Sequence, residues 1–322
     1  MTEPAATPTT ALPSADATAP SVGGPDPTDP ARSTARRRTG VRRWIGHPVA
    51  VLVVGFVLVY AVPSILFNQF LTGPLGTVPG DYPAALIGAV IASMVAWLLY
   101  VFAVRRGLEG WRARELAPRP ALLVGGVLLA LFTLAAVLGV TALTGGVTMD
   151  RTAAWWPAVA GSLAFAIKGG VVEELFYRGI LLRATERCLG GWLALAFSAV
   201  FFGVAHVGTP GATVWTTICL VVTAGVTLGA AYLATGSLWL PMAIHFGWNL
   251  GQALLGVPVS GQASPGPWST TVTGPAWITG GVYGPEASAV TVVIWLSVAV
   301  VLLVMAHRRG RLRPPAWARP TR

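Results

Sequence analysis

The sequence contains few charged residues. Of its 322 residues, 11% are Asp, Glu, Lys or Arg, whereas 54% are hydrophobic and the mean hydropathy is +0.67. Because a soluble globular protein carries about a quarter charged residues, this composition excludes an ordinary soluble domain and indicates an integral membrane protein. The chain has only two cysteines, Cys188 and Cys219, both in or beside apolar runs, so no disulfide framework is expected.

Residues 1–43 lack any periodic apolar pattern and are rich in Ala, Thr, Pro, Ser and Arg. Such a segment cannot bury enough surface to offset its ordering entropy, so we expect a disordered basic cytoplasmic tail. The first apolar run begins near residue 49, which is too late for a cleaved signal peptide.

Apolar stretches long enough to cross a bilayer as a helix, about 20 residues, recur along the rest of the chain. The eight candidates are 49–69, 84–104, 121–143, 154–177, 192–207, 213–235, 237–256 and 288–306. The sequence therefore predicts an all-α, polytopic membrane helix bundle with about eight transmembrane helices. The expected domains are three transmembrane helices in 44–150, a four-helix core in 151–256, an extracytoplasmic Gly/Pro/Ser loop in 257–287, and the last helix and a basic tail in 288–322.

Positive charge is distributed asymmetrically about these spans. On this assignment 20 of the 22 Lys and Arg residues flank the spans on one face, and the opposite loops hold only Arg151. Basic residues beside a span stay cytoplasmic, so we expect a multi-pass cell-membrane protein with both termini in the cytoplasm. Topology and anionic lipid explain the net charge of +10, and no nucleic-acid partner is expected.

Few ionisable residues remain at membrane depth: Lys168, Glu173, Glu174, His206 and His245, with Arg178 nearby. Charges in a bilayer are costly, so they usually face a bundle interior and function there. Residues four apart share a helix face, which pairs Glu174 with Arg178. By the same rule His245 shares a face with Asn249. Glu173 points about 100° away from Glu174, and this leaves it free for another task.

Two glycines indicate how distant residues meet. Gly190 and Gly191 predict a tight turn that makes the flanking spans antiparallel neighbours. Glu173 and His206 then lie roughly 22–26 Å from the turn, at 1.5 Å per residue. Lys168 stands about 140° around the helix from Glu173, so we expect structural pairing or exposure to a cavity rather than catalysis.

Each polar residue also has a simpler explanation. Glu173 and Glu174 could mark the interfacial end of a span, paired with arginines. A lone histidine such as His206 or His245 is more often bonded to a backbone carbonyl in the core. Asn249 could join two helices by a hydrogen bond. Only the combination of these residues favours a chemical site.

Three motifs follow one another on successive spans: EELFYR at 173–178, FGVAH at 202–206 and HFGWN at 245–249. They match the patterns EExxxR, FxxxH and HxxxN without departure, and they resemble the CPBP family. This is the Abi or type II CAAX-protease family, which includes the Ras-converting prenyl-protein endopeptidase. The resemblance covers about residues 155 to 256 and implies an intramembrane endopeptidase with a cavity open to the cytoplasmic side.

The resemblance also implies roles for the residues. The catalytic set would be Glu173, Glu174, His206, His245 and Asn249, with Arg178 as the structural ion-pair partner of Glu174. Glu173 would activate water, with His206 beside it. Two mechanisms stay open: a glutamate peptidase, or a metallopeptidase in which Glu173, His206 and His245 bind Zn²⁺. The HExxH spacing is absent, so no recognised motif signals the metal.

Two other function classes fit the composition. A proton-coupled transporter could use the same residues as a relay, but the repeated halves typical of transporters are not found in the sequence. A non-catalytic CPBP-type scaffold or immunity protein would keep the fold without needing all five polar residues. The expected partners are membrane lipid and a membrane-associated protein or peptide substrate, with or without a lipid.

Overall fold

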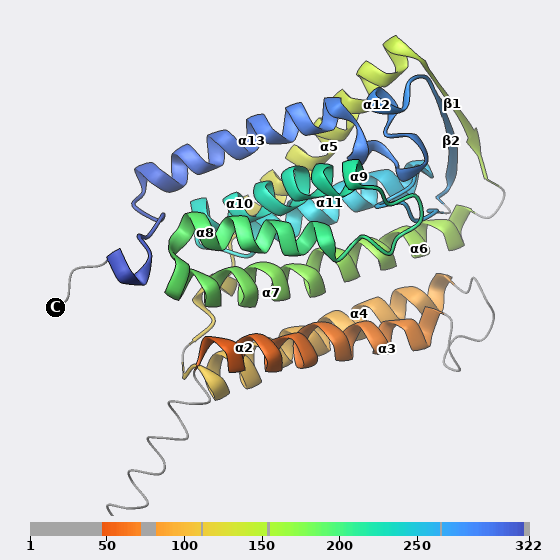
Figure 1. Cartoon of the computed structure of the whole chain (residues 1–322). Coiled ribbons are helices and arrows are strands. Elements are labelled where there is room, and N and C mark those ends of the chain that lie inside the picture. Colours follow the sequence, from red (N-terminus) through yellow and green to blue (C-terminus); the bar gives the residue numbers. More distant parts are fainter. Residues whose placement is uncertain (1–46, 72–81, 111, 153–154, 265, 319–322) are drawn as a thin grey trace, which may run out of the picture. The chain divides into compact units, whose positions relative to one another are not determined.

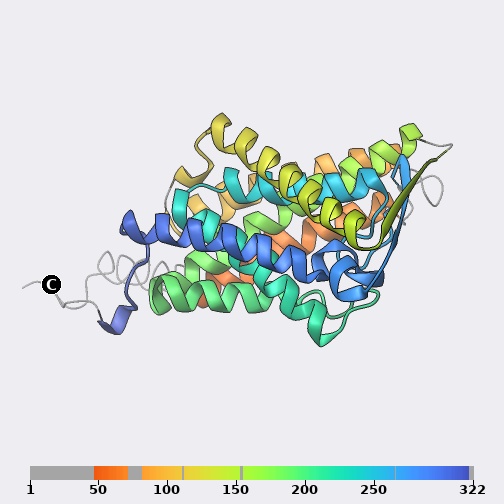
Figure 2. The ribbon, with the colours of Figure 1, turned by 90° about the horizontal axis from the view of Figure 1, so that it is seen from above.

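The computed structural model describes residues 47–71, 82–110, 112–152, 155–264 and 266–318 (Figure 1). The predicted tail 1–43 lies outside the described residues. Figure 1 and Figure 2 show helices as the dominant element of the described chain, which confirms the predicted all-α membrane bundle.

The first helices form a hairpin. They are α2 (Pro48–Gly55), a π-helical segment (Phe56–Ala61), α3 (Val62–Leu71), α4 (Tyr82–Leu98) and a second π-helical segment (Leu99–Leu108). Pro48 occupies the first turn of α2, where its missing N–H costs nothing. Gly88 of α4 lies against the ring of Phe70, because a Cβ there would come within 2.4 Å of that side chain. The hairpin therefore depends on a small residue where the helices approach closely.

The remaining helices pack beside one another. They are α5 (Pro120–Thr144), α6 (Trp155–Lys168), α7 (Glu174–Phe176), α8 (Arg183–Val204), α9 (Val214–Leu220), α10 (Thr227–Thr235), α11 (Trp239–Leu255) and α13 (Ala289–Arg308). Three π-helical segments, Gly169–Glu173, Tyr177–Leu182 and Val221–Val226, continue α6, α7 and α9, and 3-10 turns occupy Arg114–Leu116 and Ala316–Ala318. α5 lies along α11, and α13 lies along α10 (Figure 1, Figure 2).

Six helices among the described residues are long and apolar enough to cross a membrane. One of them, Trp155–Val204, is a 50-residue run that holds both predicted spans 154–177 and 192–207. α11 covers the predicted span 237–256 but has only 17 residues. The predicted count of eight transmembrane helices is therefore not confirmed.

The long run bends back on itself at Gly190. This glycine has φ 73° and ψ 175°, a conformation that side chains disfavour. Gly191 N–H donates to the carbonyl of Arg313 at 2.9 Å. A Cβ added at Gly190 would clash with the backbone of the same segment, residues 313–315. The hydroxyl of Ser198 reaches the carbonyl of Tyr177 at 3.2 Å. The two arms are therefore antiparallel neighbours, as the glycine pair predicts.

The sequence did not predict the two-stranded sheet. β1 (Gly146–Arg151) pairs antiparallel with β2 (Trp268–Thr273), with Gly146 opposite Thr273. The segment 257–287 also contains α12 (Ala276–Thr279) and 3-10 turns at Gly281–Tyr283 and Pro285–Ala287. The predicted loop is thus ordered structure, and the sheet ties it to the chain that precedes α6 (Figure 1).

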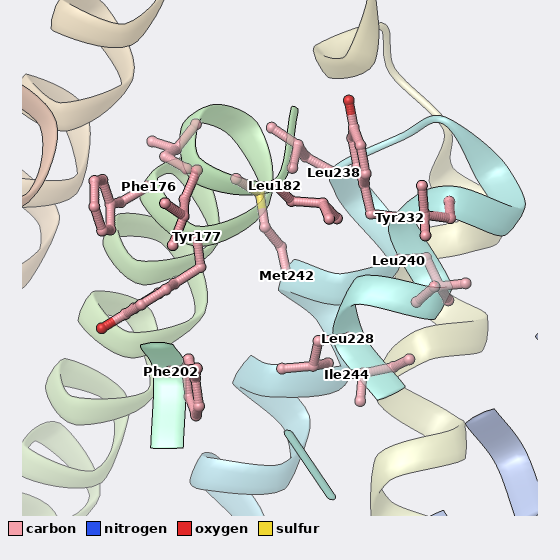
Figure 3. Packing of buried hydrophobic residues seen from close by; sticks show 14 of the residues in the cluster. Phe176, Tyr177, Leu182, Phe202, Leu228, Tyr232, Leu238, Leu240, Met242 and Ile244 are labelled. Carbon is pink, nitrogen blue, oxygen red and sulfur yellow. The ribbon is translucent and has the colours of Figure 1, made fainter. Parts of the chain in front are cut away.

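An apolar core joins the helices around α11. Figure 3 shows Tyr177 and Phe202 close to each other, in the same cluster as Leu228 of α10 and Ile244 of α11. The rings of Tyr177 and Phe202 meet edge to face at 4.9 Å, a geometry that aromatic pairs favour. This packing fixes α8 and α11 relative to the helix that carries the two glutamates.

Charged groups cluster where the π-helical segment Leu99–Leu108 ends. The side chain of Glu109 has no exposed surface and contacts Arg105, Arg183 and Arg187. Glu115 is bound to Arg105 and Tyr100 in the same place. Burial alone would raise the pKa of the Glu109 carboxyl, but the arginines outweigh burial and hold this pKa below its ordinary value of 4.5.

This cluster predicts a loss of stability in acid. Since the folded-state pKa of Glu109 lies below the unfolded value, its contribution to stability is complete above about pH 4.5. The contribution disappears as the pH falls through the folded-state pKa. Melting temperatures measured in detergent from pH 7 to pH 3 should fall over this range, and Glu109→Gln should flatten the fall. An equally steep fall in Glu109→Gln would contradict the assignment.

Candidate functional site

π-helical segments surround the two glutamates. Gly169–Glu173 and Tyr177–Leu182 flank the single turn of α7, and Val221–Val226 packs beside α8. In a π segment the backbone bonds run from residue i to i+5, and such segments are frequent at functional sites. Residues five apart therefore approach each other here, although ideal α-helical geometry separates them.

This geometry gives Glu173 a partner that the sequence did not reveal. The Lys168 ammonium contacts Glu173 Oε1 at 2.9 Å and lies 5.7 Å from the ring centroid of Tyr60. We expected Lys168 to pair or to face a cavity, and the structure shows pairing. The partner escaped prediction because a 3.6-residue turn places Glu173 about 140° away, whereas the π turn aligns the two side chains.

Glu174 binds two groups at once. Its Oε1 accepts from Arg178 Nη1 at 2.7 Å and contacts His245 Nδ1 at 2.8 Å. Glu174 and Arg178 are fully buried, and Arg178 also donates to the carbonyls of Ala224 and Gly225. The predicted pairing of Glu174 with Arg178 is present. The contact with His245 spans 71 residues of chain and could not be found from helical spacing.

His245 and Asn249 lie on the face of α11 that meets the glutamate-bearing helix. A Cβ on Gly169 would come within 2.8 Å of Asn249 Nδ2 and 3.5 Å of His245 Nε2. At Gly170 a Cβ would come within 2.9 Å of Phe246 Cβ. These two glycines therefore allow α11 to approach closely enough for His245 to reach Glu174. The predicted alignment of His245 with Asn249 is present, and both are buried.

His206 lies just beyond the end of α8, in a turn. Its Nδ1 contacts the carbonyl of Phe202 at 2.8 Å, and the two rings pack at 4.8 Å. This bond to a backbone carbonyl matches the simpler explanation for a lone histidine. It also places the proton of the neutral ring on Nδ1, so Nε2 carries a free lone pair. Glu173 interacts electrostatically with both His206 and His245.

A cavity of about 30 Å³ adjoins this set of residues. His245 and Asn249 line it, together with Thr223, Ser260 and Glu286 and the apolar side chains of Phe202, Leu220, Leu228, Ile244, Trp248 and Trp295. Ser260 and Glu286 come from the segment 257–287, to which sequence reasoning assigned no role. Only an isolated acid in a Gly- and Pro-rich stretch could have drawn attention to Glu286.

The described residues do not fit a zinc site built from Glu173, His206 and His245. No three His, Cys, Asp or Glu side chains among the described residues are gathered closely enough to hold a metal ion. Glu173, the carboxylate of this ligand set, is already bound to the Lys168 ammonium group.

The comparisons with known proteins agree with the motifs. Residues 153–251 match the family model described as Type II CAAX prenyl endopeptidase Rce1-like. This segment belongs to the Rce1-like family. It contains all three motifs, from Glu173 to Asn249, whereas Ser260 and Glu286 lie outside the match. No curated protein and no solved structure matches the chain. The six apolar helices indicate a multi-pass membrane protein, and its matched segment resembles a protease family.

Proposed function

We propose that the protein is an intramembrane endopeptidase that hydrolyses a peptide bond in a membrane-associated, lipidated protein or peptide. The main support for this proposal is that two adjacent carboxylates inside the Rce1-like segment have different partners. Glu173 has one ammonium partner, and Glu174 is committed to Arg178 and His245. Glu173 is therefore available for catalysis, whereas Glu174 orients the neighbouring side chains of the site.

In the proposed reaction Glu173 is the general base. It takes a proton from water as the water oxygen attacks the carbonyl carbon, and this proton then passes to the leaving amine as the C–N bond breaks. General-base catalysis of this kind typically contributes about 10²–10⁴-fold. The contacts of Glu173 support the assignment, because Lys168 engages only Oε1 and leaves Oε2 available to a water molecule.

His245 and Asn249 would stabilise the tetrahedral oxyanion. Glu174 accepts from Nδ1–H of the His245 imidazole, so His245 would donate to the oxyanion through Nε2–H in its protonated form, in which both ring nitrogens are donors. An orienting carboxylate is a common support for a catalytic histidine. The Asn249 amide is four residues further along the same helix face. Preorganised donors in a water-poor site act strongly on developing charge. His206 would assist Glu173 through its free Nε2.

The charge distribution supports a cytoplasmic location for both termini of a cell-membrane protein. Arg119 and Arg309 donate to carbonyls at the end of α10, and Arg183 and Arg187 contact Glu109 at the end of the π-helical segment Leu99–Leu108. Arg151 lies on β1, at the opposite end of α5 from Arg119. Since positive charge stays inside, the arginine-rich end would face the cytoplasm. Reporter fusions at the two termini test this orientation.

A cleavage assay tests the function. The full chain in liposomes is incubated with a library of lipidated peptides, and new termini are identified by mass spectrometry, with Glu173→Gln as the inactive control. We expect cleavage by the intact protein only. Equal products from both proteins, or none from either alongside a proton flux, would reject the peptidase. Metal analysis of pure protein and assays after chelation separate the glutamate mechanism from the zinc alternative.

A further inference from the structure

The cavity beside His245 and Asn249 is bounded on its other side by chain outside the family match. Ser260 and Glu286, both beyond residue 251, line the cavity. Glu286 is 5% exposed, so its carboxylate is almost withdrawn from solvent. A buried carboxylate is costly unless nearby groups or water solvate it. The surroundings of Glu286 therefore indicate what occupies the cavity.

Hydrogen-bond donors face the Glu286 carboxylate. Oε2 accepts from Ser260 N at 2.8 Å and from Ser260 Oγ at 2.7 Å. Oε1 is 3.2 Å from Trp248 Nε1. This indole N–H is shared, because the Gln252 amide fits best with its oxygen 2.6 Å from Trp248 Nε1 and its nitrogen donating to Pro258. Oε1 is thus weakly satisfied, and no Lys, Arg or His among the described residues forms an ion pair with Glu286.

Asn249 faces the same space with unused hydrogen-bonding capacity. Its side chain is 5% exposed and makes no hydrogen bond to any described residue. Buried amides normally have partners. A cavity needs about 10–15 Å³ to hold one water, and the water needs two to four polar partners. The 30 Å³ present has room for about two waters between Asn249, Glu286, Ser260 and Thr223.

We propose that this cavity holds the water consumed in peptide hydrolysis, and that Glu286 retains it there. The inference rests on the proposed peptidase function. Water is scarce at membrane depth, and the other walls of the cavity are apolar. A carboxylate with a free lone pair and an unpartnered amide keep water against His245. This water is then available to the general base, and each hydrolysis consumes one water molecule from the cavity.

The turn that contains Ser260 positions the Glu286 carboxylate. Ser260 has φ 49° and is the only described residue other than glycine with a positive φ. It forms a tight turn with Gly261, which is closed by the pairing of Val259 with Gln262. Strained residues persist where the surroundings over-determine them, often at functional sites. Ser260 donates both of its hydrogen bonds to Glu286, so the strained turn fixes the position of this carboxylate.

Radiolytic labelling of the full chain in detergent tests for the water without requiring activity. X-ray pulses in H₂¹⁸O oxidise buried side chains that touch bound water, so Trp248 should be labelled although it is 7% exposed. Glu286→Leu should lower labelling of Trp248 several-fold, and Glu286→Gln should lower it less. Unlabelled Trp248 in the intact protein, or unchanged labelling in both variants, would overturn the proposal.

Kinetics supply the second measurement. Glu286→Leu should lower kcat about ten- to hundredfold, the effect of a lost hydrogen bond to a charged group, with little change in KM. If this variant does not fold, Glu286→Gln gives the comparison. Ser288→Ala is the matched control, because Ser288 directly follows this segment, is fully buried and donates to Ile278 within it, but does not line the cavity.

The control separates water retention from loop stability. Ser288→Ala should leave both Trp248 labelling and kcat unchanged. Equal losses in Ser288→Ala and Glu286→Leu would show that stability of the segment is the cause and would reject the water role. An active Glu286→Leu beside an inactive Glu173→Gln would reject this inference alone. Absence of cleavage by the intact protein would reject the peptidase, while labelling would still test the water.

Discussion

Replacing Glu174 with alanine should lower the free energy of unfolding by about 3–5 kcal/mol and abolish the proposed cleavage. Glu174 and Arg178 are fully buried and 2.7 Å apart. Removing one partner of a buried ion pair leaves the other charge uncompensated, which costs this amount. His245 loses the partner of its Nδ1 in the same step. Denaturant unfolding in detergent measures the stability, and the liposome assay measures the cleavage.

A double variant separates these two effects. Glu174→Leu combined with Arg178→Met replaces the ion pair by apolar side chains of similar volume, which is often neutral or stabilising. Stability should return to about that of the intact protein, whereas cleavage should not, because His245 remains unsupported. Full cleavage by the double variant would show that Glu174 does not orient His245. Unfolding of Glu174→Ala at the same denaturant concentration as the intact protein would show that the ion pair is not stabilising.

Glu173→Gln should lower kcat by about 10²–10⁴-fold, the usual contribution of a general base, with little change in KM. Glutamine keeps the size of the side chain but cannot accept the proton of water. The substitution also removes the contact between Lys168 and Glu173, so the loss of activity needs a control for the broken ion pair. Single-turnover kinetics on a peptide from the library measure kcat and KM separately.

Lys168→Met supplies this control. It breaks the same contact but keeps the Glu173 carboxylate, so it should retain most of the activity that Glu173→Gln loses. Lys168→Met should also unfold at a denaturant concentration close to that of Glu173→Gln, since each variant removes one charge of the Lys168–Glu173 ion pair. If Lys168→Met is as inactive as Glu173→Gln, the ion pair rather than the base is responsible, and the role of Glu173 is wrong.

Helical spacing predicted some of these contacts and missed others for a definite reason. Glu174 and Arg178 are four residues apart, and their contact follows from helical geometry alone. Lys168 and Glu173 are five apart, and their contact depends on the π-helical segment Gly169–Glu173. No pattern in the sequence predicts where an α-helix changes to a π-helical segment. The sequence therefore showed that Glu173 and Glu174 have different tasks, but not which cation accompanies Glu173.

The bend at Gly190 was also predictable, because two adjacent glycines interrupt an apolar run and permit φ 73°. The number of spans was harder to predict. The run Trp155–Val204 is not one straight helix, because it reverses at Gly190 and the Gly191 N–H donates to Arg313 instead of to its own helix. The predicted spans 154–177 and 192–207 therefore lie in the two antiparallel arms of this run.

The sequence by itself determined the membrane class, the helical bundle, the three motifs and the split between Glu173 and Glu174. These features depend on composition and on spacing of four residues or fewer, which local geometry controls. Only the tertiary structure decided that Glu174 meets His245 and that Glu286 reaches the cavity beside Asn249. Both contacts join segments far apart in the chain, and close helix packing at Gly169 and Gly170 and the strained turn at Ser260 bring them together.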